Sequence, residues 1–293
     1  MYYILYGFLY MLSLLPWRLM YVISDGLYLL LYYLIGYRKE VVMQNLRTAF
    51  PEKSDRERGR IAKDFYHNFL DTFIEMIKLI SITEKQFRKR NTINIEVLND
   101  LYGKVPNVAI VSGHFFNWEV GSLSTSLDNK FKLLAVYMPV TNKAFDKIMY
   151  DMRTKFGATF IPATDFKNQI VKYADASFCL GLLADQNPGN LNSAVWVPFF
   201  GKLTSFVKGP EKFSVRNNSA VVFGQSHRIK RGFYNFKLSV VTTEPHSYPE
   251  GALTKKLIEL TEENIRKNPS NYLWSHRRWK HEFKEEYRGS VIE

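Results

Sequence analysis

The sequence has one cysteine among its 293 residues, Cys179, which excludes an intrachain disulfide framework and fits a reducing compartment. Cys179 lies within the apolar run Phe178–Leu183. Cysteines in such surroundings are usually buried and inert. We therefore expect a small buried side chain here rather than a nucleophile.

The sequence also lacks the motifs of several large enzyme classes. It has neither the phosphate-cradling P-loop nor the G-x-G-x-x-G fingerprint of dinucleotide-binding folds. The run Gly224-Gln225-Ser226 begins like the nucleophile elbow of a serine hydrolase, but the closing glycine is missing, which disfavours that class. Histidine and cysteine never cluster at metal-ligand spacing, so we expect no metal site.

Acidic residues are outnumbered, with 28 Asp and Glu against 40 Lys and Arg and a net charge of +12. This excess indicates an acidic partner, which is nucleic acid, anionic lipid or an acidic carrier protein. Hydrophobic residues make up 46% of the chain, which allows a sizeable core and argues against disorder. The length suits one large domain or one domain with an appendage.

The first 36 residues are almost free of charge, with only Arg18 and Asp25. A small-residue cleavage site is missing, which argues against a cleaved signal peptide. Residues 19–36 are just long enough to span a bilayer. We therefore predict a membrane-anchoring helical segment over residues 1–36 and a catalytic domain over residues 37–293. A buried core helix is the alternative, and whether the anchor spans the bilayer or lies in its interface stays open.

Four polar side chains mark one face of this segment. Tyr21, Asp25, Tyr28 and Tyr32 are spaced by four, three and four residues, which places them along one side of a helix. We expect this side to contact the protein and the opposite side to contact lipid. Basic residues follow directly, at Arg38, Lys39 and Arg47. Their position predicts that the rest of the chain lies in the cytosol.

The remaining pattern alternates between apolar runs and helical stretches. Residues 61–80 have apolar residues at helical spacing and a polar opposite face, on which we expect His67 to be solvated. Strands are predicted at 108–112, 132–137, 158–161, 178–183, 195–200, 220–225 and 234–241, and helices at 117–127, 143–155, 166–174, 207–217 and 252–267. This alternation predicts an α/β fold with a largely parallel central sheet flanked by helices.

One segment stands out chemically. The run Val108–Ser112 reads as a buried strand, and it passes through Gly113 into His114, with Glu119 five positions later. Ligands of open α/β sheets bind where strands end. Glu119 could accept a hydrogen bond from one ring nitrogen of His114 and leave the other as a general base. A histidine satisfied by a nearby carboxylate for purely structural reasons is the alternative.

This spacing and several further motifs resemble a known family. The H-x4-E pattern at His114 and Glu119 is similar to the signature of the glycerolipid acyltransferase superfamily. Further segments resemble one branch of it, the late acyltransferases of lipid A biosynthesis (the lauroyl/myristoyl transferase family). These segments are residues 45–52, Asn142 with 153–157, 185–188, 197–202 with Thr204, and 271–280. In this order the motifs are specific, and they cover the chain from about residue 40 to 280.

The resemblance implies an enzyme of the bacterial inner membrane, with a hydrophobic N-terminal helix and an active site facing the cytosol. It implies transfer of a fatty acyl chain from acyl carrier protein to a hydroxyl of a membrane lipid, a lipid A precursor. No cofactor is expected beyond the phosphopantetheine of the donor, and no nucleic acid partner. The family's histidine carries over to His114, its acidic partner to Glu119 and its arginine to Arg153.

The residue types suit this chemistry. His114 can take the proton of a lipid hydroxyl, with Glu119 fixing the tautomer and stabilising the imidazolium. Attack on a thioester creates an oxyanion that needs a cation or N–H donors. We expect Arg153 in that role, with the backbone N–H groups near Phe115 and Phe116 as the alternative.

Other polar residues of the motifs are expected to contact or support the substrate. Asp185 and Gln186 follow an apolar run and are expected to form a polar network at the site, or else a structural turn. Guanidinium groups match phosphate oxygens, so the C-terminal basic motif predicts contact with a phosphorylated headgroup. Folding back by aromatic stacking is its alternative. The substrate-binding candidates are Asn117, Asp185, Gln186, Arg277, Arg278 and Lys280.

Two other functions are compatible with parts of the sequence. The same chemistry could act on another acceptor, such as a lysophospholipid or a bacterial aminolipid. A non-catalytic basic protein that binds membrane or nucleic acid would show diffuse Lys and Arg clusters and would not need a paired His and Glu. The ordered series of motifs disfavours this last class.

Overall fold

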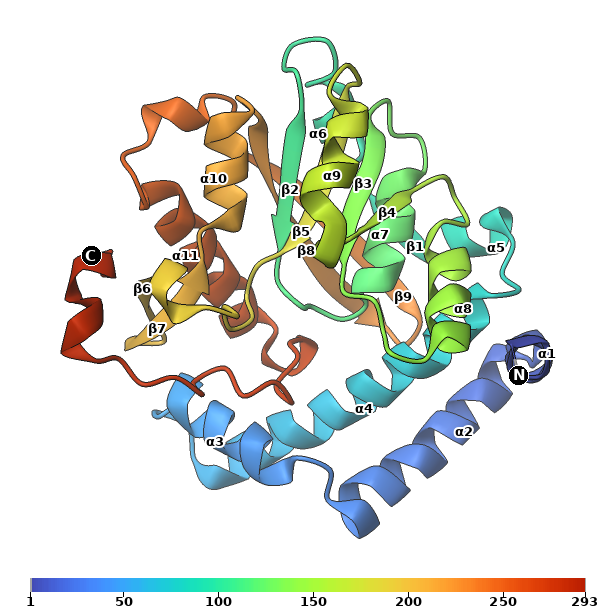
Figure 1. Ribbon diagram of the computed structural model, residues 1–293. Coiled ribbons are helices and arrows are strands. Elements are labelled where there is room, and N and C mark those ends of the chain that lie inside the picture. Colours follow the sequence, from blue (N-terminus) through green and yellow to red (C-terminus); the bar gives the residue numbers. More distant parts are fainter. Residues whose placement is uncertain (1, 293) are drawn as a thin grey trace.

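The computed structural model describes residues 2–292 and has an α/β fold with a mixed, mostly parallel seven-stranded sheet (Figure 1). The strand order is β1-β9-β8-β2-β5-β3-β4. Strands β8, β2, β5, β3 and β4 are parallel, and β9 is antiparallel to β8. The bounds are β1 Asn91–Ile93, β2 Val108–Ser112, β3 Lys132–Tyr137, β4 Thr159–Pro162, β5 Phe178–Leu183, β8 Ala220–Lys230 and β9 Phe233–Thr242. The predicted largely parallel sheet is confirmed.

Helices cover both faces of the sheet, because the central strands are apolar on both sides. Residues of α7 and α8 pack on the face that carries Phe236. Residues of α9, α10 and α11 pack on the opposite face, which carries Val111 and Leu134. The bounds are α5 Glu84–Arg88, α6 Glu96–Asn99, α7 Trp118–Ser126, α8 Lys143–Arg153, α9 Phe166–Ile170, α10 Gly209–Arg216 and α11 Ala252–Lys267.

The predicted elements of the catalytic part are present, with small shifts at most ends, and β8, predicted to end at residue 225, continues to Lys230. Strands β2, β3 and β5 and helix α11 have the predicted bounds. Two strands were not predicted. The first, β1, has three residues, too few for an alternating pattern to be visible. The second, β7 (Lys202–Val207), pairs with β6 (Ala194–Phe199) in a separate hairpin whose turn, Phe200-Gly201, has positive φ angles of 52° and 73°.

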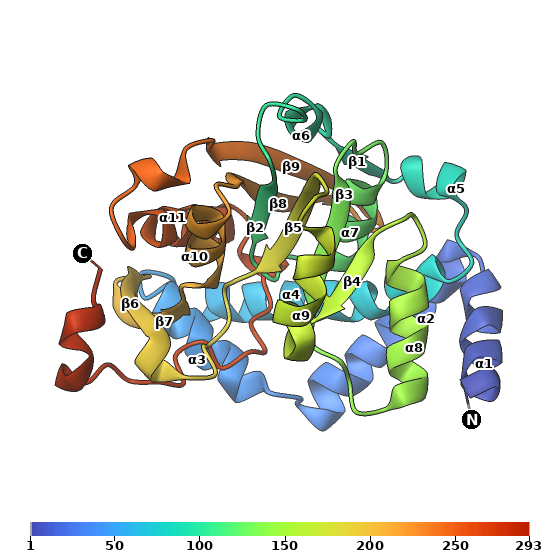
Figure 2. The ribbon, with the colours of Figure 1, turned by 45° about the horizontal axis from the view of Figure 1, so that its top comes forward.

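Four N-terminal helices lie at one end of the sheet, below the carboxyl ends of its parallel strands in Figure 1. They are α1 Tyr2–Leu14, α2 Trp17–Leu29, α3 Lys39–Ala49 and α4 Asp55–Leu79, and a π-helical segment, Leu30–Ile35, continues α2. A capping box at Ser54 and Glu57 starts α4. Figure 2 shows α2 running beside α4 on the outside of the molecule.

Helix α2 has the two-sided character that its spacing predicts. Tyr21 donates a hydrogen bond to Glu75 of α4, and Tyr28 stacks on His67 of α4 at 3.6 Å between ring centroids. The opposite side is apolar and exposed. It carries Leu19, Val22, Ile23, Leu27, Leu29, Leu30, Tyr33, Leu34 and Ile35. The helical stretch Trp17–Ile35, 19 residues long, is long and apolar enough to cross a membrane. The limits of the predicted division at residues 1 and 293 lie outside the described residues, and the division itself stays a prediction.

The polar face of α4 is partly covered by other segments, and His67, expected to be solvated, lies in the covered part. Asp71 is 1% exposed and binds Arg228 and Arg231 of the β8–β9 hairpin. Asp25 of α2 binds Arg231 from the other side. His67 is held in the stack with Tyr28 and is only partly exposed. The polar residues lie on one side of α4, as their spacing predicts, and their partners come from distant segments that a local pattern does not show.

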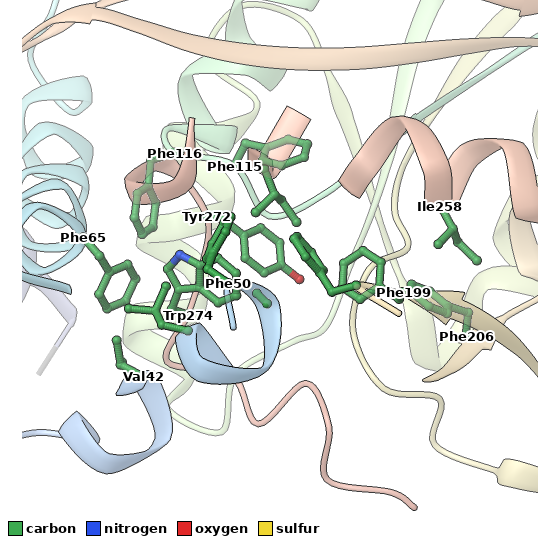
Figure 3. Close-up of a cluster of buried hydrophobic side chains, with 14 of the residues drawn as sticks. Val42, Phe50, Phe65, Phe115, Phe116, Phe199, Phe206, Ile258, Tyr272 and Trp274 are labelled. Carbon is green, nitrogen blue, oxygen red and sulfur yellow. The ribbon is translucent and has the colours of Figure 1, made fainter. Parts of the chain in front are cut away.

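An aromatic cluster joins the N-terminal helices to the C-terminal segment (Figure 3). Trp274 is fully buried, contacts Phe50 and Tyr272 edge-on and donates its indole N–H to the carbonyl of Pro269. Asn45 of α3 donates to the carbonyls of Trp274 and His276. The residues after α11 are therefore fixed against α3 and α4.

Replacing Trp274 by alanine should remove the centre of this cluster. We expect the free energy of unfolding to fall by about 3–5 kcal/mol, the usual cost of deleting a large buried aromatic side chain. Denaturant unfolding of the purified chain measures this change. Val171→Ala, at an exposed position, is the control and should stay within about 0.5 kcal/mol of the wild type. Equal stability of the two variants would contradict this packing.

Candidate active site

His114 and Asp185 meet at the carboxyl edge of the sheet. His114 follows β2 and Asp185 follows β5, and these two strands are adjacent and parallel, with Ser112 in register with Leu183. The register extends one residue further, since the N–H of Ala184 donates to the carbonyl of Ser112. Nδ1 of His114 lies 2.7 Å from Oδ1 of Asp185. The sheet therefore brings together two residues that are 71 positions apart.

The electrostatics of the pair decide which of the two side chains carries the proton. Burial alone would raise the pKa of Asp185, but the charge and hydrogen bond of His114, with a hydrogen bond from Tyr272, lower it to about 2. Burial would lower the pKa of His114, but Asp185, and to a smaller extent Glu119, raise it above its usual value. The carboxylate is thus ionised and accepts the Nδ1–H of His114. This leaves Nε2 as the nitrogen that can act as a base.

This geometry corrects the expected partner of His114. The sequence predicts a hydrogen bond from the ring to Glu119, whereas the structure gives that bond to Asp185. Glu119 instead lies in the first turn of α7 and pairs with Arg153 in the last turn of α8. Glu119, five residues after His114, already lies on α7 and not at the ring. The register of β2 and β5 places Asp185 next to Nδ1 instead.

Arg153 and Glu119 form a two-point ion pair. Nε of Arg153 lies 2.9 Å from Oε2 of Glu119, and Nη2 lies 2.5 Å from Oε1. The indole N–H of Trp118 also donates to Glu119 at 3.2 Å, and Glu119 is 3% exposed. Such bidentate contacts fix the orientation of a guanidinium group. Glu119 therefore positions Arg153, which lines the same cavity as His114.

Two alternative oxyanion donors are already engaged. The N–H of Phe115 donates to the carbonyl of Gly113, and the N–H of Phe116 donates to the carbonyl of Asn271. Both N–H groups at Phe115 and Phe116 already have backbone acceptors. Arg153 is the predicted donor that remains at the cavity.

A cavity of about 400 Å³ extends from His114 between α7 and the sheet. This volume lies in the usual range for a small-molecule site. Small residues contribute to the space, since Gly121 of α7 and Gly181, Ala135 and Gly224 of the sheet all line the cavity. The other apolar lining residues are Ile110, Phe115, Trp118, Leu133, Val136, Met138, Phe160, Ala163, Leu182, Leu183, Phe236 and Leu238. The lining is predominantly apolar, with the charged or titratable side chains of His114, Glu119 and Arg153 among its polar groups.

The structure gives Asn117 a different role from the predicted substrate contact. Its side chain is completely buried. The Oδ1 atom caps α7 by accepting the N–H of Val120, and Nδ2 donates to Glu75 of α4 at 3.2 Å. With both ends engaged, Asn117 holds the start of α7 in place.

The C-terminal basic residues separate into two groups. Arg278 is 1% exposed, donates to Asn187 and to the carbonyl of Ser205, and stacks on Phe206. It is a structural side chain and cannot reach a headgroup, which corrects the prediction. Arg277 and Lys280 are exposed, and Gln186 is half-buried beside Asp185.

Three residues near the pair were not predicted as site residues. Tyr272 is buried and hydrogen-bonded to Asp185. His276 is kept neutral, because burial, followed by the charge of Arg278, lowers its pKa to about 4. Arg38 donates to the carbonyl of Ser275 at 2.9 Å. Tyr272 and His276 lie inside a recognised motif, but nothing in its spacing shows which of its side chains turns toward the histidine.

Metal binding and thiol chemistry find no support in the part of the chain that the structure describes. Within residues 2–292, no group of three His, Cys, Asp or Glu side chains could hold a metal ion. Cys179 is buried, and its burial raises the pKa of the thiol to about 12. The expectation of a small buried side chain at Cys179 is confirmed.

Comparison with known proteins agrees with the motifs. The model of the bacterial lipid A biosynthesis acyltransferases matches residues 1–281. The chain is 23% identical over 277 residues to the lipid A biosynthesis lauroyltransferase of Escherichia coli (strain K12), covering 94% of this chain and 89% of that protein. It is 23% identical over 248 residues to the lipid A biosynthesis palmitoleoyltransferase of the same organism, covering 83% and 79%. A lipid A biosynthesis acyltransferase of Haemophilus influenzae is 22% identical over 247 residues, covering 83% and 78%.

The His114–Asp185 contact predicts a titration that NMR can follow. We expect the His114 imidazole to titrate above its ordinary pKa of about 6.5. In Asp185→Asn the charge that favours the protonated ring is gone while the burial remains, so its pKa should fall below that of the wild type. A spectrum of His114→Gln assigns the signal. An unchanged His114 pKa in Asp185→Asn would show that Asp185 is not its partner.

Proposed function

Since this chain belongs to the bacterial lipid A biosynthesis acyltransferase family, we propose that it transfers a fatty acyl chain from the thioester of acyl carrier protein to a hydroxyl of a lipid A precursor. The observation that carries the proposal is the His114–Asp185 pair at one end of an apolar cavity. A base poised beside an apolar slot is what hydroxyl acylation by a fatty acyl thioester requires.

His114 acts as the general base in this proposal. Nε2 takes the proton of the acceptor hydroxyl while its oxygen forms a bond to the thioester carbonyl carbon. Asp185 stabilises the resulting imidazolium through Nδ1. When the tetrahedral intermediate collapses, the carbon–sulfur bond breaks, and the imidazolium returns the proton to the leaving thiolate. The products are an ester and a thiol, and no covalent bond to the enzyme forms.

Arg153 stabilises the oxyanion of that intermediate. Glu119 holds the guanidinium by two contacts, so little reorganisation is needed when charge develops on the substrate oxygen. The ion pair also partly offsets the positive charge of Arg153. Arg153 then acts mainly as a hydrogen-bond donor of fixed orientation toward the substrate. Losing a single donor of this kind typically costs about 2.7–4 kcal/mol of barrier.

The acyl chain of the donor lies between α7 and the sheet. The cavity starts at His114 and is lined by apolar side chains deeper in. Burial of each methylene contributes about 0.8 kcal/mol, so an apolar slot of this kind favours the chains that fill it. The phosphopantetheine arm belongs to the donor, and the enzyme itself needs no further cofactor.

The N-terminal helices seat the enzyme on the bacterial inner membrane, with the catalytic domain in the cytosol. The polar side of α2 is bound to α4, and its outer side is exposed and apolar. A helix covered by protein along one side suits the membrane interface better than a free span. Arg277 and Lys280, with Arg38 nearby, then meet the anionic surface and the phosphates of the acceptor. The charge of +12 also favours an acidic carrier protein.

Replacing His114 tests the function directly. We expect His114→Ala to lower kcat for acyl transfer from acyl carrier protein by about 10²–10⁴-fold while the fold is kept, because the hydroxyl loses its base. Mass spectrometry of lipids from a deletion strain shows which species lacks one acyl chain, and the wild-type gene, but not the variant, should restore it. Retained transfer by His114→Ala would defeat the mechanism. If lipid A is unchanged and the lysophospholipid or aminolipid pool is altered instead, that lipid and not a lipid A precursor is the acceptor.

Gly181 tests the site of the acyl chain. A side chain built at Gly181 has ordinary contacts with Ala135 at its base and extends into the cavity. We expect Gly181→Val to shift the donor preference toward shorter chains, with a loss in kcat/KM of roughly fourfold for each methylene that no longer fits. Gly59→Val, in open space on α4, is the control. An unchanged chain-length profile would place the acyl chain elsewhere.

A further inference from the structure

Glu75 is a buried carboxylate that joins three distant parts of the molecule. It lies on α4 and is 2% exposed. It accepts hydrogen bonds from Tyr234 of β9 at 2.7 Å, from Tyr21 of α2 at 3.1 Å and from Asn117 at 3.2 Å. The three donors come from the sheet, from the apolar N-terminal helix and from the cap of the helix that follows His114.

A carboxylate at this position is costly for stability alone. Its burial raises the pKa of Glu75, against the hydrogen bonds and the charge of Arg228. Apolar side chains of similar size usually stabilise a buried position at least as well as a charged one. The neighbouring core of α4 is apolar, with Met76 and Leu79 packed under α7 and α8. What the carboxylate adds is a set of directed contacts.

One of these contacts reaches the catalytic turn. Asn117 stands three residues after His114 and two before Glu119, and it is the N-cap of α7. A displacement of Asn117 therefore moves both the base and the carboxylate that holds Arg153. The contact from Glu75 fixes the side chain of this cap from outside the turn.

The second contact reaches the apolar helix. Beside Tyr21, Ser24 donates to Asp71 at 2.7 Å and Asp25 binds Arg231, so α2 is seated on α4 through its polar side. Its opposite side is the exposed apolar face that we assign to the membrane interface. Glu75 is thus bonded on one side to the seat of α2 and on the other to the catalytic turn.

We propose that Glu75 is a positioning residue, through which the seating of α2 on α4 sets the geometry of the turn from His114 to Glu119. This inference rests on the proposed acyl transfer, since it concerns the rate of that reaction. Glu75 does not contact the substrate. It acts through Asn117, and α2 contributes to catalysis as well as to attachment.

Two variants test the connection at its two ends. Glu75→Gln places an amide N–H against donors, so Asn117 or a tyrosine loses its acceptor. Tyr21→Phe removes only the contact from α2. We expect kcat to fall by about 10–100-fold in Glu75→Gln and roughly threefold to tenfold in Tyr21→Phe, with the KM for the acyl donor unchanged, because small displacements of reacting groups are costly.

The pH profile separates positioning from a general loss of stability. His114 owes its raised pKa to Asp185 and Glu119, with Arg278 and His276 near the pair. A loosened turn weakens these contacts, so the acidic limb of kcat/KM should move to lower pH in both variants. Binding to anionic vesicles should not change, since the outer face of α2 is intact.

Matched controls exist in the same chain. Glu211 is another buried carboxylate, which accepts the N–H groups of Gly251 and Thr254 away from His114. Glu211→Gln should lower the unfolding temperature and leave kcat and the pH profile of the folded enzyme unchanged. Tyr102→Phe, at a half-exposed position beyond α6, controls for the loss of a hydroxyl.

The outcomes are distinct. Wild-type kcat and pH profiles in folded Glu75→Gln and Tyr21→Phe would overturn the inference, as would equal losses in Glu211→Gln. If Glu75→Gln does not fold, Tyr21→Phe decides alone, through kcat and the acidic limb. Absence of acyl transfer in the wild type, or its persistence in His114→Ala, would instead refute the proposed function.

Discussion

The hydrogen-bonded register between β2 and β5 is the constraint on which the site depends. It continues one residue past the strands, through the N–H of Ala184, and so delivers His114 and Asp185 to the same point at the sheet edge. A slip of either strand by one residue would turn its own side chain to the wrong face, away from its partner. The same register places Gly181 beside Ile110, where the absence of a side chain opens the cavity. The base and its apolar slot therefore have one structural origin.

A second layer of the molecule is built around the acidic residues of α4. Asp71 and Glu75 lie one helical turn apart and are both buried. They bind side chains of α2 on one side and of the β8–β9 hairpin and the catalytic turn on the other. An amphipathic helix would usually place such residues in solvent. Here Asp71 and Glu75 on the polar face of α4 bind α2, whose opposite side is apolar and exposed.

The C-terminal segment closes the site from the remaining side. Leu273 donates its N–H to the carbonyl of His114, and Tyr272 binds Asp185 from within the aromatic cluster of Figure 3. Arg278 is buried between Phe206 and the polar loop that follows β5. The basic motif therefore has two roles. Arg278 stabilises the fold, and Arg277 and Lys280 lie at the surface.

The sequence by itself determined all the strands but β1 and β7, the main helices, the two-sided character of α2 and the family to which the ordered motifs belong. The strands and helices are local features, since alternation and helical spacing can be read within about ten residues. Only the tertiary structure decided that His114 pairs with Asp185, that Glu119 holds Arg153, and that Asn117 and Arg278 are structural. Each of those contacts joins residues on different elements, and the pairing of distant strands and helices determines them. Spacing along the chain placed Glu119 near the histidine, but the register of two strands put Asp185 on its ring.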